Sequence, residues 1–190
     1  MRMNRTAFFD RMRGPLFGGR LPPVAVDGLT HLLDTWEREY AALDRRWLAY
    51  ALATAHHETG RTMQPVREVG RGKGKRYGVR DPETKRTYYG RGVVQLTWRR
   101  NYQVMSDRVG HDLVRNPDLA LLPAVSARIL FEGMIYGLFT GKRFADYFMG
   151  SREEWGQARR IINGMDRAET IAGYGRLYDA ALATALGVDV

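Results

Sequence analysis

The 190-residue sequence contains no cysteine. This absence excludes disulfide bonds, thiol nucleophiles and cysteine-ligated zinc, and it is typical of proteins that fold in a reducing cytoplasm. The sequence also lacks any uninterrupted apolar run long enough to span a bilayer. Arginines are frequent near the N-terminus, but no apolar segment follows them. We therefore expect neither a secretory signal peptide nor a transmembrane segment.

Hydrophobic residues make up 44% of the chain, which is enough for a folded core. The sequence shows no internal repeat, no low-complexity tract and no clear linker, so we predict one domain over residues 1–190. Residues 14–23 are rich in Gly and Pro and are predicted to be a loop. We therefore expect the N-terminal segment 1–23 to be partly extended.

The chain is strongly basic, with a formal net charge of +9 and a pI of about 10.1. A field of this sign favours polyanionic partners such as nucleic acid, phospholipid headgroups, lipopolysaccharide or an anionic cell wall. Charge alone indicates the class of partner and says nothing about the fold.

Apolar residues recur at helical spacing over most of the chain. Asp44 is a predicted N-cap, and the sequence Ser151-Arg152-Glu153-Glu154 is a predicted capping box. Residues 59–92 are rich in Gly, Arg and Lys, and we predict an irregular excursion there with a short hairpin around residues 77–88. We predict helices over residues 24–43, 45–57, 123–139, 151–162 and 169–186. The fold class is therefore mainly α.

Glu58 ends a largely apolar predicted helix and opens the irregular segment. A carboxyl group in that position lies partly in the core and partly in a cleft. Partial burial favours the protonated form of a carboxyl group, as a general acid requires. The alternative is an exposed glutamate at a helix end that pairs with a nearby arginine.

His56 and His57 precede this glutamate, but no histidine follows at the spacing of a zinc protease helix. His31 and His111 are distant in the sequence. We therefore expect no metal site and no other cofactor.

A second polar and aromatic segment reads YYGRGVVQLTWRRNY from Tyr88 to Tyr102. Its glycines allow close approach to a ligand, and its aromatic rings are suited to stacking on sugars. A basic, aromatic stretch of this kind is equally compatible with single-stranded nucleic acid, or with a buried aromatic turn.

This segment resembles the signature of glycoside hydrolase family 19. His57-Glu58-Thr59 looks like the His-Glu-Thr of that family, and residues 116–119 and 161–164 resemble its Asn-Pro-Asp-Leu and Ile-Asn-Gly elements in the same order. Phe8-Phe9-Asp10-Arg11 and residues 60–68 are similar to the phage and prophage endolysin branch. The resemblance implies a single lysozyme-like, two-lobed helical catalytic domain, with a short β-hairpin or irregular loop beside the cleft and no separate carbohydrate-binding module.

The resemblance also implies an inverting acid/base mechanism in which Glu58 is the acid. Thr97 would help to hold the water, and His57 would orient the acid. Arg91 would bridge the carboxylates or hold its loop. His56 is expected to be structural. The predicted substrate-binding residues are His57, Tyr89, Arg91, Gln95, Thr97, Asn101 and Asn163.

The general base is less clear, because the loop that carries it in plant members is shorter here. Glu68, Asp81 and Glu83 are the candidates, and a mechanism without a strict base is a further alternative. We favour Glu68, since Arg67 and Arg71 flank it and neighbouring cations keep a carboxylate ionised. Asp81-Pro82-Glu83 is more typical of a turn.

We predict an endolysin-type glycoside hydrolase that cleaves β-1,4 bonds between the amino sugars of peptidoglycan. The alternatives are a chitinase acting on poly-GlcNAc and a non-catalytic wall-binding module of the same fold; a nucleic-acid-binding protein is favoured by charge alone. The expected partner is a glycan chain, with an anionic envelope surface as a further partner. We expect a monomer made in the cytoplasm that acts on the cell wall after release, passing from the host cytoplasm to the periplasm.

Overall fold

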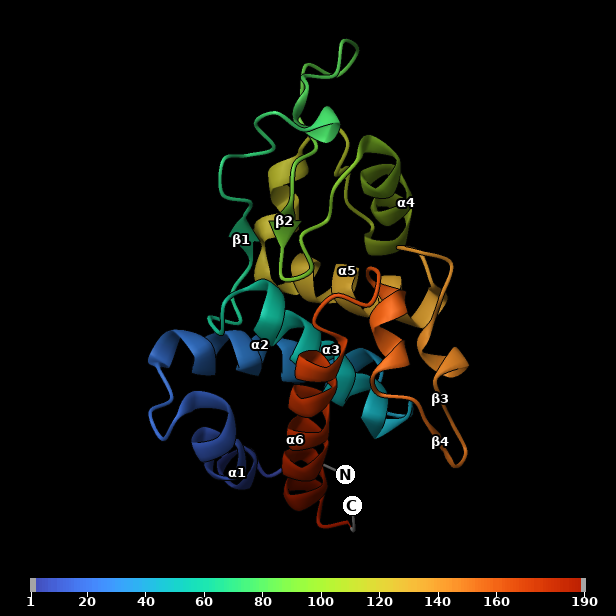
Figure 1. Ribbon diagram of the computed structural model, residues 1–190. Helices are drawn as coiled ribbons and strands as arrows, with labels where there is room; N and C mark the ends of the chain where they lie inside the picture. The colour runs from blue at the N-terminus through green and yellow to red at the C-terminus, as the bar shows by residue number, and fades with distance from the viewer. Residues whose placement is uncertain (1–2, 189–190) are drawn as a thin grey trace.

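The computed structural model describes residues 3–188, which are mainly helical (Figure 1). The α-helices are α1 (Arg5–Phe17), α2 (Pro23–Glu39), α3 (Arg45–Glu58), α4 (Arg99–Val109), α5 (Pro123–Tyr136) and α6 (Ala168–Leu186). The 3-10 helices are η1 (Arg76–Gly78), η2 (Pro117–Leu121), η3 (Phe144–Asp146) and η4 (Gln157–Ile161). The strands are β1 (Val66–Arg67), β2 (Arg91–Gly92), β3 (Phe148–Met149) and β4 (Arg152–Glu153). None of the helices within residues 3–188 combines the length and the apolar composition of a bilayer span.

The elements gather in two lobes (Figure 1). The lower lobe contains α1, α2, α3 and α6, and the upper lobe contains β1, β2, α4 and the long segment between β1 and β2. Helix α5 lies between them and contacts α2 and α3 on one side and α4 on the other. This arrangement confirms the predicted lysozyme-like fold class.

The core of the lower lobe is the contact between α3 and α6. Helix α3 is buried almost all round from Leu48 to His56, and alanine occupies four of these positions. Small side chains allow the two helices to approach closely; a Cβ added at Gly175 of α6 would lie 3.4 Å from the Tyr50 ring of α3 and 2.7 Å from the nearby Trp155 ring. The predicted N-cap is confirmed, since the Asp44 side chain accepts a hydrogen bond from the Arg46 backbone N–H at 2.9 Å. Such a cap stabilises a helix by about 1 kcal/mol.

The N-terminal segment is helical where we predicted a loop. Helix α1 continues through Gly14 and Pro15 and ends at Gly18, which adopts the left-handed conformation. The Gly-Pro pair was therefore misleading, because tertiary packing overrides local propensity. Phe8, Met12 and Leu16 recur every fourth residue and are buried, and Phe8 stacks on Tyr178 of α6.

The predicted hairpin around residues 77–88 is also not formed as regular strands. Two backbone hydrogen bonds join the arms there, from Asp81 N–H to Arg86 O at 2.7 Å and from Tyr88 N–H to Tyr77 O at 3.3 Å. Regular strand pairing occurs outside residues 77–88, where β1 and β2 form an antiparallel pair with Val66 opposite Gly92. The glycines and cations between the strands offer no apolar face that would stabilise a longer sheet.

The predicted helix over 151–162 is wrong. Residues 152–153 form β4, which pairs with β3, and only η4 is helical in this stretch. The backbone N–H of Glu154, whose side chain would have closed the capping box, instead donates to the Tyr147 carbonyl at 3.1 Å. The neighbouring Glu153 carboxylate accepts a hydrogen bond from Arg46 of α3, also at 3.1 Å. A tertiary contact thus replaces the local cap.

One histidine of α3 is part of the core, as predicted. His56 is 1% exposed, and its Nδ1 lies 2.9 Å from the Tyr178 hydroxyl. Burial, reinforced by the charges of Arg61 and His57, lowers the pKa of His56 from 6.5 to about 4. The folded protein therefore keeps this ring neutral under conditions in which the unfolded chain protonates it.

This burial predicts a loss of stability in acid. As the pH falls from about 6.5 to about 4, the unfolded chain binds a proton at His56 before the folded chain does, so the free energy of unfolding falls by about 3 kcal/mol. Urea unfolding at pH 7 and pH 4, for wild type and His56→Gln, measures this contribution. The pH-dependent loss should be smaller in the variant, and equal losses in both proteins would contradict the assignment.

Candidate active site

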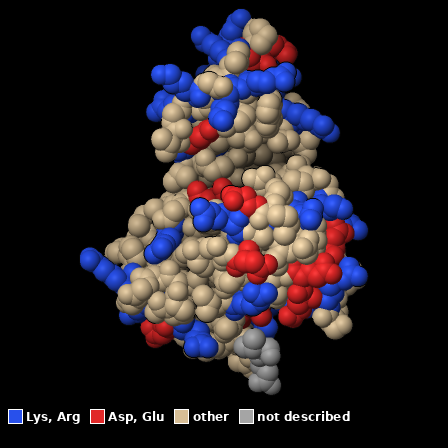
Figure 2. Space-filling model, in the orientation of Figure 1, with Lys and Arg blue, Asp and Glu red and all other residues tan. Residues whose placement is uncertain are grey.

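Glu58 lies in a cavity of about 380 Å³ between the lobes. Figure 2 shows the surface narrowing at this level, between the lower lobe and the strongly basic tip of the upper lobe. Glu58, the last residue of α3, contributes from the lower lobe, and the segment 94–98 contributes from the upper lobe. The cavity is lined by Glu58, Val94, Gln95, Leu96, Thr97, Trp98, Asn101, Phe139, Ile162 and Asn163. The structure thus brings together five of the predicted site residues: Glu58, Gln95, Thr97, Asn101 and Asn163.

The carboxyl group of Glu58 has one charged partner. Its side chain is 20% exposed, and Oε1 accepts a hydrogen bond from Arg159 Nη1 at 3.2 Å. The Arg159 side chain is 4% exposed and also donates from Nε to the Asp166 carbonyl at 3.2 Å. Because these two contacts hold the guanidinium in place, Arg159 fixes the position of one carboxylate oxygen of Glu58, Oε1.

Arg159 is therefore expected to position Glu58. We predict that Arg159→Gln lowers kcat roughly tenfold or more while KM changes little, since the loss of one charge-assisted hydrogen bond misorients the acid without removing a sugar contact. Arg159→Lys should recover part of kcat. The measurement is steady-state kinetics on a soluble chitin oligosaccharide, with thermal unfolding to confirm folding. A variant that raises KM at unchanged kcat would contradict the positioning role.

The upper-lobe side of the cavity is a tightly bonded turn. The Arg91 N–H and Leu96 N–H each donate to the other's carbonyl, at 3.2 and 2.9 Å, and the Val93 N–H donates to Ser126 Oγ at 2.9 Å. Gln95 and Trp98 both have positive φ, at 53° and 70°. Residues other than glycine adopt this conformation at a cost, and such positions are frequent at functional sites.

Gln95 connects the cavity to the preferred base candidate. Its Nε2 donates to the Val66 and Gly92 carbonyls at 3.0 and 3.1 Å. A Cβ added at Gly90 would lie 2.7 Å from Gln95 Oε1 and 3.2 Å from Glu68 Cβ. The absence of a side chain at Gly90 therefore leaves room for the Gln95 and Glu68 side chains, which both approach the position that a Cβ would occupy.

Both carboxylate oxygens of Glu68 accept hydrogen bonds. The Tyr77 hydroxyl donates to Oε1 at 2.7 Å, and the Gly90 N–H donates to Oε2 at 3.0 Å. The hydrogen bond to Glu68 raises the pKa of Tyr77. The flanking arginines do not act as predicted: Arg67 pairs with Asp118 at 2.9 Å, and within residues 3–188 no ion pair joins Arg71 to Glu68.

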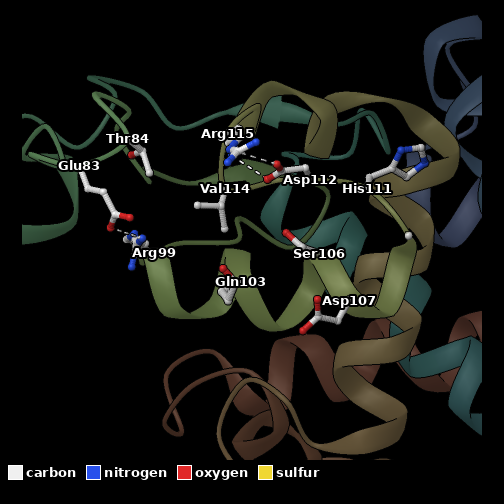
Figure 3. Close-up of a pocket in the computed structure, with 11 residues that line it drawn as sticks. Glu83, Thr84, Arg99, Gln103, Ser106, Asp107, His111, Asp112, Val114 and Arg115 are labelled. Carbon is white, nitrogen blue, oxygen red and sulfur yellow. Dashed lines mark hydrogen bonds and ion pairs between the residues drawn. The ribbon is translucent and has the colours of Figure 1, made fainter.

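The other two base candidates lie elsewhere. Asp81 accepts hydrogen bonds from the backbone N–H groups of Glu83 and Thr84, which confirms the predicted turn. Those hydrogen bonds, with that from Thr84 Oγ1 and the charge of Arg99, lower the pKa of Asp81 against a small opposing effect of burial. Glu83 pairs with Arg99 at 2.7 Å beside a different cavity (Figure 3). None of the three base candidates lines the cavity of Glu58. Glu68 differs from the other two because it packs at Gly90 beside Gln95, which does line the cavity.

Arg91 and Tyr89 hold the loop and do not enter the Glu58 cavity. The Arg91 guanidinium lies 3.7 Å from the centroid of the Tyr89 ring and donates to Asp118 Oδ1 at 2.7 Å. It also donates to the Thr87 and Tyr89 carbonyls and to the Tyr102 hydroxyl. Arg91 is 5% exposed and Tyr89 is 6% exposed. Of the two predicted roles for Arg91, the structure thus supports the loop-holding one.

The remaining predicted residues differ in position. Thr97 and Asn101 are half-buried in the cavity wall, and Asn163 is exposed at its rim. His57 is half-buried beside Glu58 but does not line the cavity. Within residues 3–188, no three His, Cys, Asp or Glu side chains are grouped closely enough to hold a metal ion.

Sequence reasoning missed several contributors to the site, among them Arg159, Phe139, Ile162 and Trp98. Arg159 stood in a segment predicted to be an ordinary helix, and Phe139 and Ile162 looked like core residues. Trp98 was part of the quoted segment but was given no role; its side chain is 46% exposed and its ring meets Tyr77 edge to face. Its exposure is the property that a sequence does not reveal.

Comparison of the sequence with known proteins identifies related chitinases. Residues 70–144 match the family model of the class I chitinases of glycoside hydrolase family 19. Chitinase 3 of Oryza sativa subsp. japonica is 30% identical over 159 residues, which cover 69% of this chain and 47% of that protein. Chitinase 8 of the same plant is 40% identical over 89 residues, covering 45% of this chain and 33% of that protein. The chain spans less than half the length of the curated relatives that it matches.

Solved structures extend the likeness to nearly the whole chain. Chitinase C from Streptomyces griseus has a TM-score of 0.61 and 23% identity, covering 98% of this chain and 77% of that one. A class IV chitinase from Zea mays has a TM-score of 0.54 and 18% identity, covering 100% and 82%. These relatives are chitinases, and membership of the phage endolysin branch stays a prediction. The described chain thus has the lysozyme-like fold of the family 19 chitinases, and its residues 70–144 match the sequence model of that family.

Proposed function

We propose that this protein is a glycoside hydrolase that cleaves β-1,4 bonds between N-acetylated amino sugars, with Glu58 as its general acid. The observation that carries the proposal is the surroundings of Glu58. A partly buried carboxyl group faces a cavity whose walls offer the polar side chains of Gln95, Thr97, Asn101 and Asn163. Hydroxyl and amide groups of this kind hydrogen-bond sugars and water, and Trp98 adds an exposed aromatic face.

In the proposed reaction, Glu58 donates its proton to the glycosidic oxygen while Glu68, as the base, removes a proton from the attacking water. The water attacks the anomeric carbon from the opposite side, so the C–O bond breaks as the new one forms and the configuration inverts. Thr97 and Gln95 are suited to hold the water, since both line the cavity and Gln95 also packs beside Glu68 at Gly90. Asn101 and Asn163 would contact the sugar.

Chitin-type poly-GlcNAc is the substrate that the relatives favour. The relatives found by sequence and by structure are named chitinases. A neutral polymer suits the Glu58 cavity, because the residues that line it include no Lys or Arg and Arg159, which contacts Glu58, is already paired with it. We therefore place chitin oligosaccharides first as substrates for the catalytic step.

Peptidoglycan is the second candidate, and one observation favours it. The net charge of +9 is far more than binding of a neutral polymer needs, whereas bacterial envelopes are anionic. The glycan of peptidoglycan also alternates β-1,4-linked amino sugars, so the same acid and base would act on it. On this reading the protein is an endolysin.

Digestion of chitin oligosaccharides and of purified peptidoglycan, with mass spectrometry of the products, tests the proposal. Shortened GlcNAc oligosaccharides from wild type, absent with Glu58→Gln, are the expected result. Release of disaccharide muropeptides as the main product would move the assignment to the peptidoglycan hydrolases. If neither polymer is cleaved under conditions in which the protein is folded, the protein is a binding module of this fold and the proposal is wrong.

A further inference from the structure

A second cavity, of about 470 Å³, lies in the upper lobe away from Glu58. We call it the basic pocket; the cations that line it are Arg71, Arg80, Lys85, Arg86 and Arg91. The surrounding segment, residues 67–100, contains eleven Lys and Arg against three Asp and Glu, a net charge of eight out of the nine of the whole chain. Figure 2 shows these basic side chains gathered at the tip of the upper lobe. The charge of the protein is therefore concentrated at one place.

Four of these cations have no carboxylate partner within residues 3–188: Arg71, Arg80, Lys85 and Arg86. Two of the guanidinium groups are nevertheless fixed by the backbone. Arg80 Nε donates to the Lys85 carbonyl, and Arg86 Nε donates to the Arg115 carbonyl, each at 2.9 Å. Because Nε is engaged, the terminal nitrogens of both side chains are left to bind an anion with little loss of side-chain freedom.

The one acidic side chain of the basic pocket does not cancel this charge. Asp118 Oδ1 accepts from Arg91 Nε at 2.7 Å, and Oδ2 accepts from Arg67 Nη2 at 2.9 Å. Both of its oxygens are therefore occupied by arginines other than the four unpaired cations. The pocket keeps a surplus of positive charge.

The neighbouring cavity in the same lobe shows the opposite arrangement. It is larger, about 680 Å³, but both of the arginines that line it pair with carboxylates of the same cavity. Figure 3 shows Glu83 joined to Arg99 and Asp112 joined to Arg115. Unpaired cations are therefore a particular property of the basic pocket and not of every hollow on this basic lobe.

We propose that the basic pocket binds a phosphate group carried on a sugar chain. Arginine forks match the oxygens of a phosphate, and Thr87 and Asn116, which also line the pocket, offer hydrogen-bonding groups for the neighbouring sugar hydroxyls. The protein would thus hold a phosphorylated polysaccharide at the tip of the lobe opposite the one that contributes Glu58.

Two other phosphate-bearing partners fit the pocket less well. Single-stranded nucleic acid is bound by stacking on exposed aromatic rings, but the one aromatic residue of the pocket, Tyr89, is 6% exposed and covered by Arg91. A membrane surface is bound by large apolar side chains beside basic ones. Of the exposed apolar residues of segment 67–100, Val69 and Val79 have short side chains, and Trp98 lines the Glu58 cavity and not the basic pocket.

The test compares binding of phosphorylated dextran and of neutral dextran of equal length, by calorimetry at low salt. The variant Arg71→Gln/Arg80→Gln/Arg86→Gln should weaken binding of phosphorylated dextran by about tenfold or more. The matched control, Arg11→Gln/Arg20→Gln/Arg176→Gln, removes the same charge from exposed positions on the lower lobe and should retain the wild-type affinity. Glu58→Gln should also retain the wild-type affinity for phosphorylated dextran, because Glu58 does not line the basic pocket. Binding at the basic pocket can therefore be tested even if the proposed enzymatic function is wrong.

Four outcomes would overturn the inference. Equal weakening in both triple variants would reduce the binding to general charge attraction, and equal binding of neutral dextran would remove the role of phosphate. Tighter, pocket-dependent binding of phosphatidylglycerol vesicles would replace the sugar chain by a membrane. Tighter, pocket-dependent binding of an oligonucleotide would replace it by nucleic acid.

Discussion

Glu58→Gln is expected to lower kcat on chitin oligosaccharides by roughly 10²–10⁴-fold, the usual contribution of a general acid. Glutamine keeps the shape of the side chain and its Oε1 still accepts the hydrogen bond from Arg159, which lies 3.2 Å away in the wild type. What the variant loses is the proton that the leaving oxygen needs. KM should therefore change little, because the polar groups that contact the sugar stay in place.

The matched control for this variant is Glu37→Gln. Glu37 lies on α2, is 27% exposed and pairs with Arg5 at 2.6 Å, so it resembles Glu58 in burial and in partner but lies outside the cavity. We expect Glu37→Gln to retain wild-type kcat, even if its free energy of unfolding falls slightly. Appreciable residual activity in a clean preparation of Glu58→Gln would show that another group supplies the proton.

Glu68→Gln is the second change with a large expected effect, a loss of about 10²-fold or more in kcat. The amide can preserve the local structure, since its oxygen accepts from the Gly90 N–H and its nitrogen donates to the Tyr77 hydroxyl oxygen. The lost property is the ability to take a proton from water. Folding should be unchanged by circular dichroism, while turnover of chitin oligosaccharides falls.

Three comparisons make the Glu68 result specific. Asp81→Asn and Glu83→Gln should leave kcat near the wild-type value, because Asp81 is a turn residue and Glu83 pairs with Arg99 beside another cavity. Added azide, an anion that attacks without a base, should restore part of the turnover of Glu68→Gln. If Asp81→Asn or Glu83→Gln is the damaging change instead, Glu68 is not the base.

The sequence predicted the parts of this structure that depend on local patterns. Periodic apolar residues located α2, α3, α5 and α6, and the N-cap of α3 was assigned correctly to Asp44. Motif order also placed Gln95, Thr97, Asn101 and Asn163 at one cavity with Glu58. The positions of these residues could be predicted because each depends on residues that are close in the chain or on the order of the motifs; their catalytic and binding roles stay predictions.

The parts that sequence reasoning could not reach depend on contacts between distant residues. Arg159 meets Glu58 across 101 positions, and no local signal distinguishes it from a surface arginine. The capping box at 151–154 was wrong for the same reason, since residues 152–153 pair with β3 as strand β4. In helix α1, tertiary contacts extend the helix through residues that the local sequence predicted to be a loop. The burial of Phe8, Met12 and Leu16 stabilises this helix more than Gly14 and Pro15 destabilise it.

The measurement that tests the central claim most directly is proton NMR of the first products released from a β-1,4-linked GlcNAc oligosaccharide. An acid at Glu58 and a water-activating base on the opposite side of the sugar require inversion. The account predicts that the new reducing end appears first as the α-anomer and then equilibrates. Initial release of the β-anomer would contradict it, because retention needs a nucleophile on the protein or on the substrate in place of an activated water.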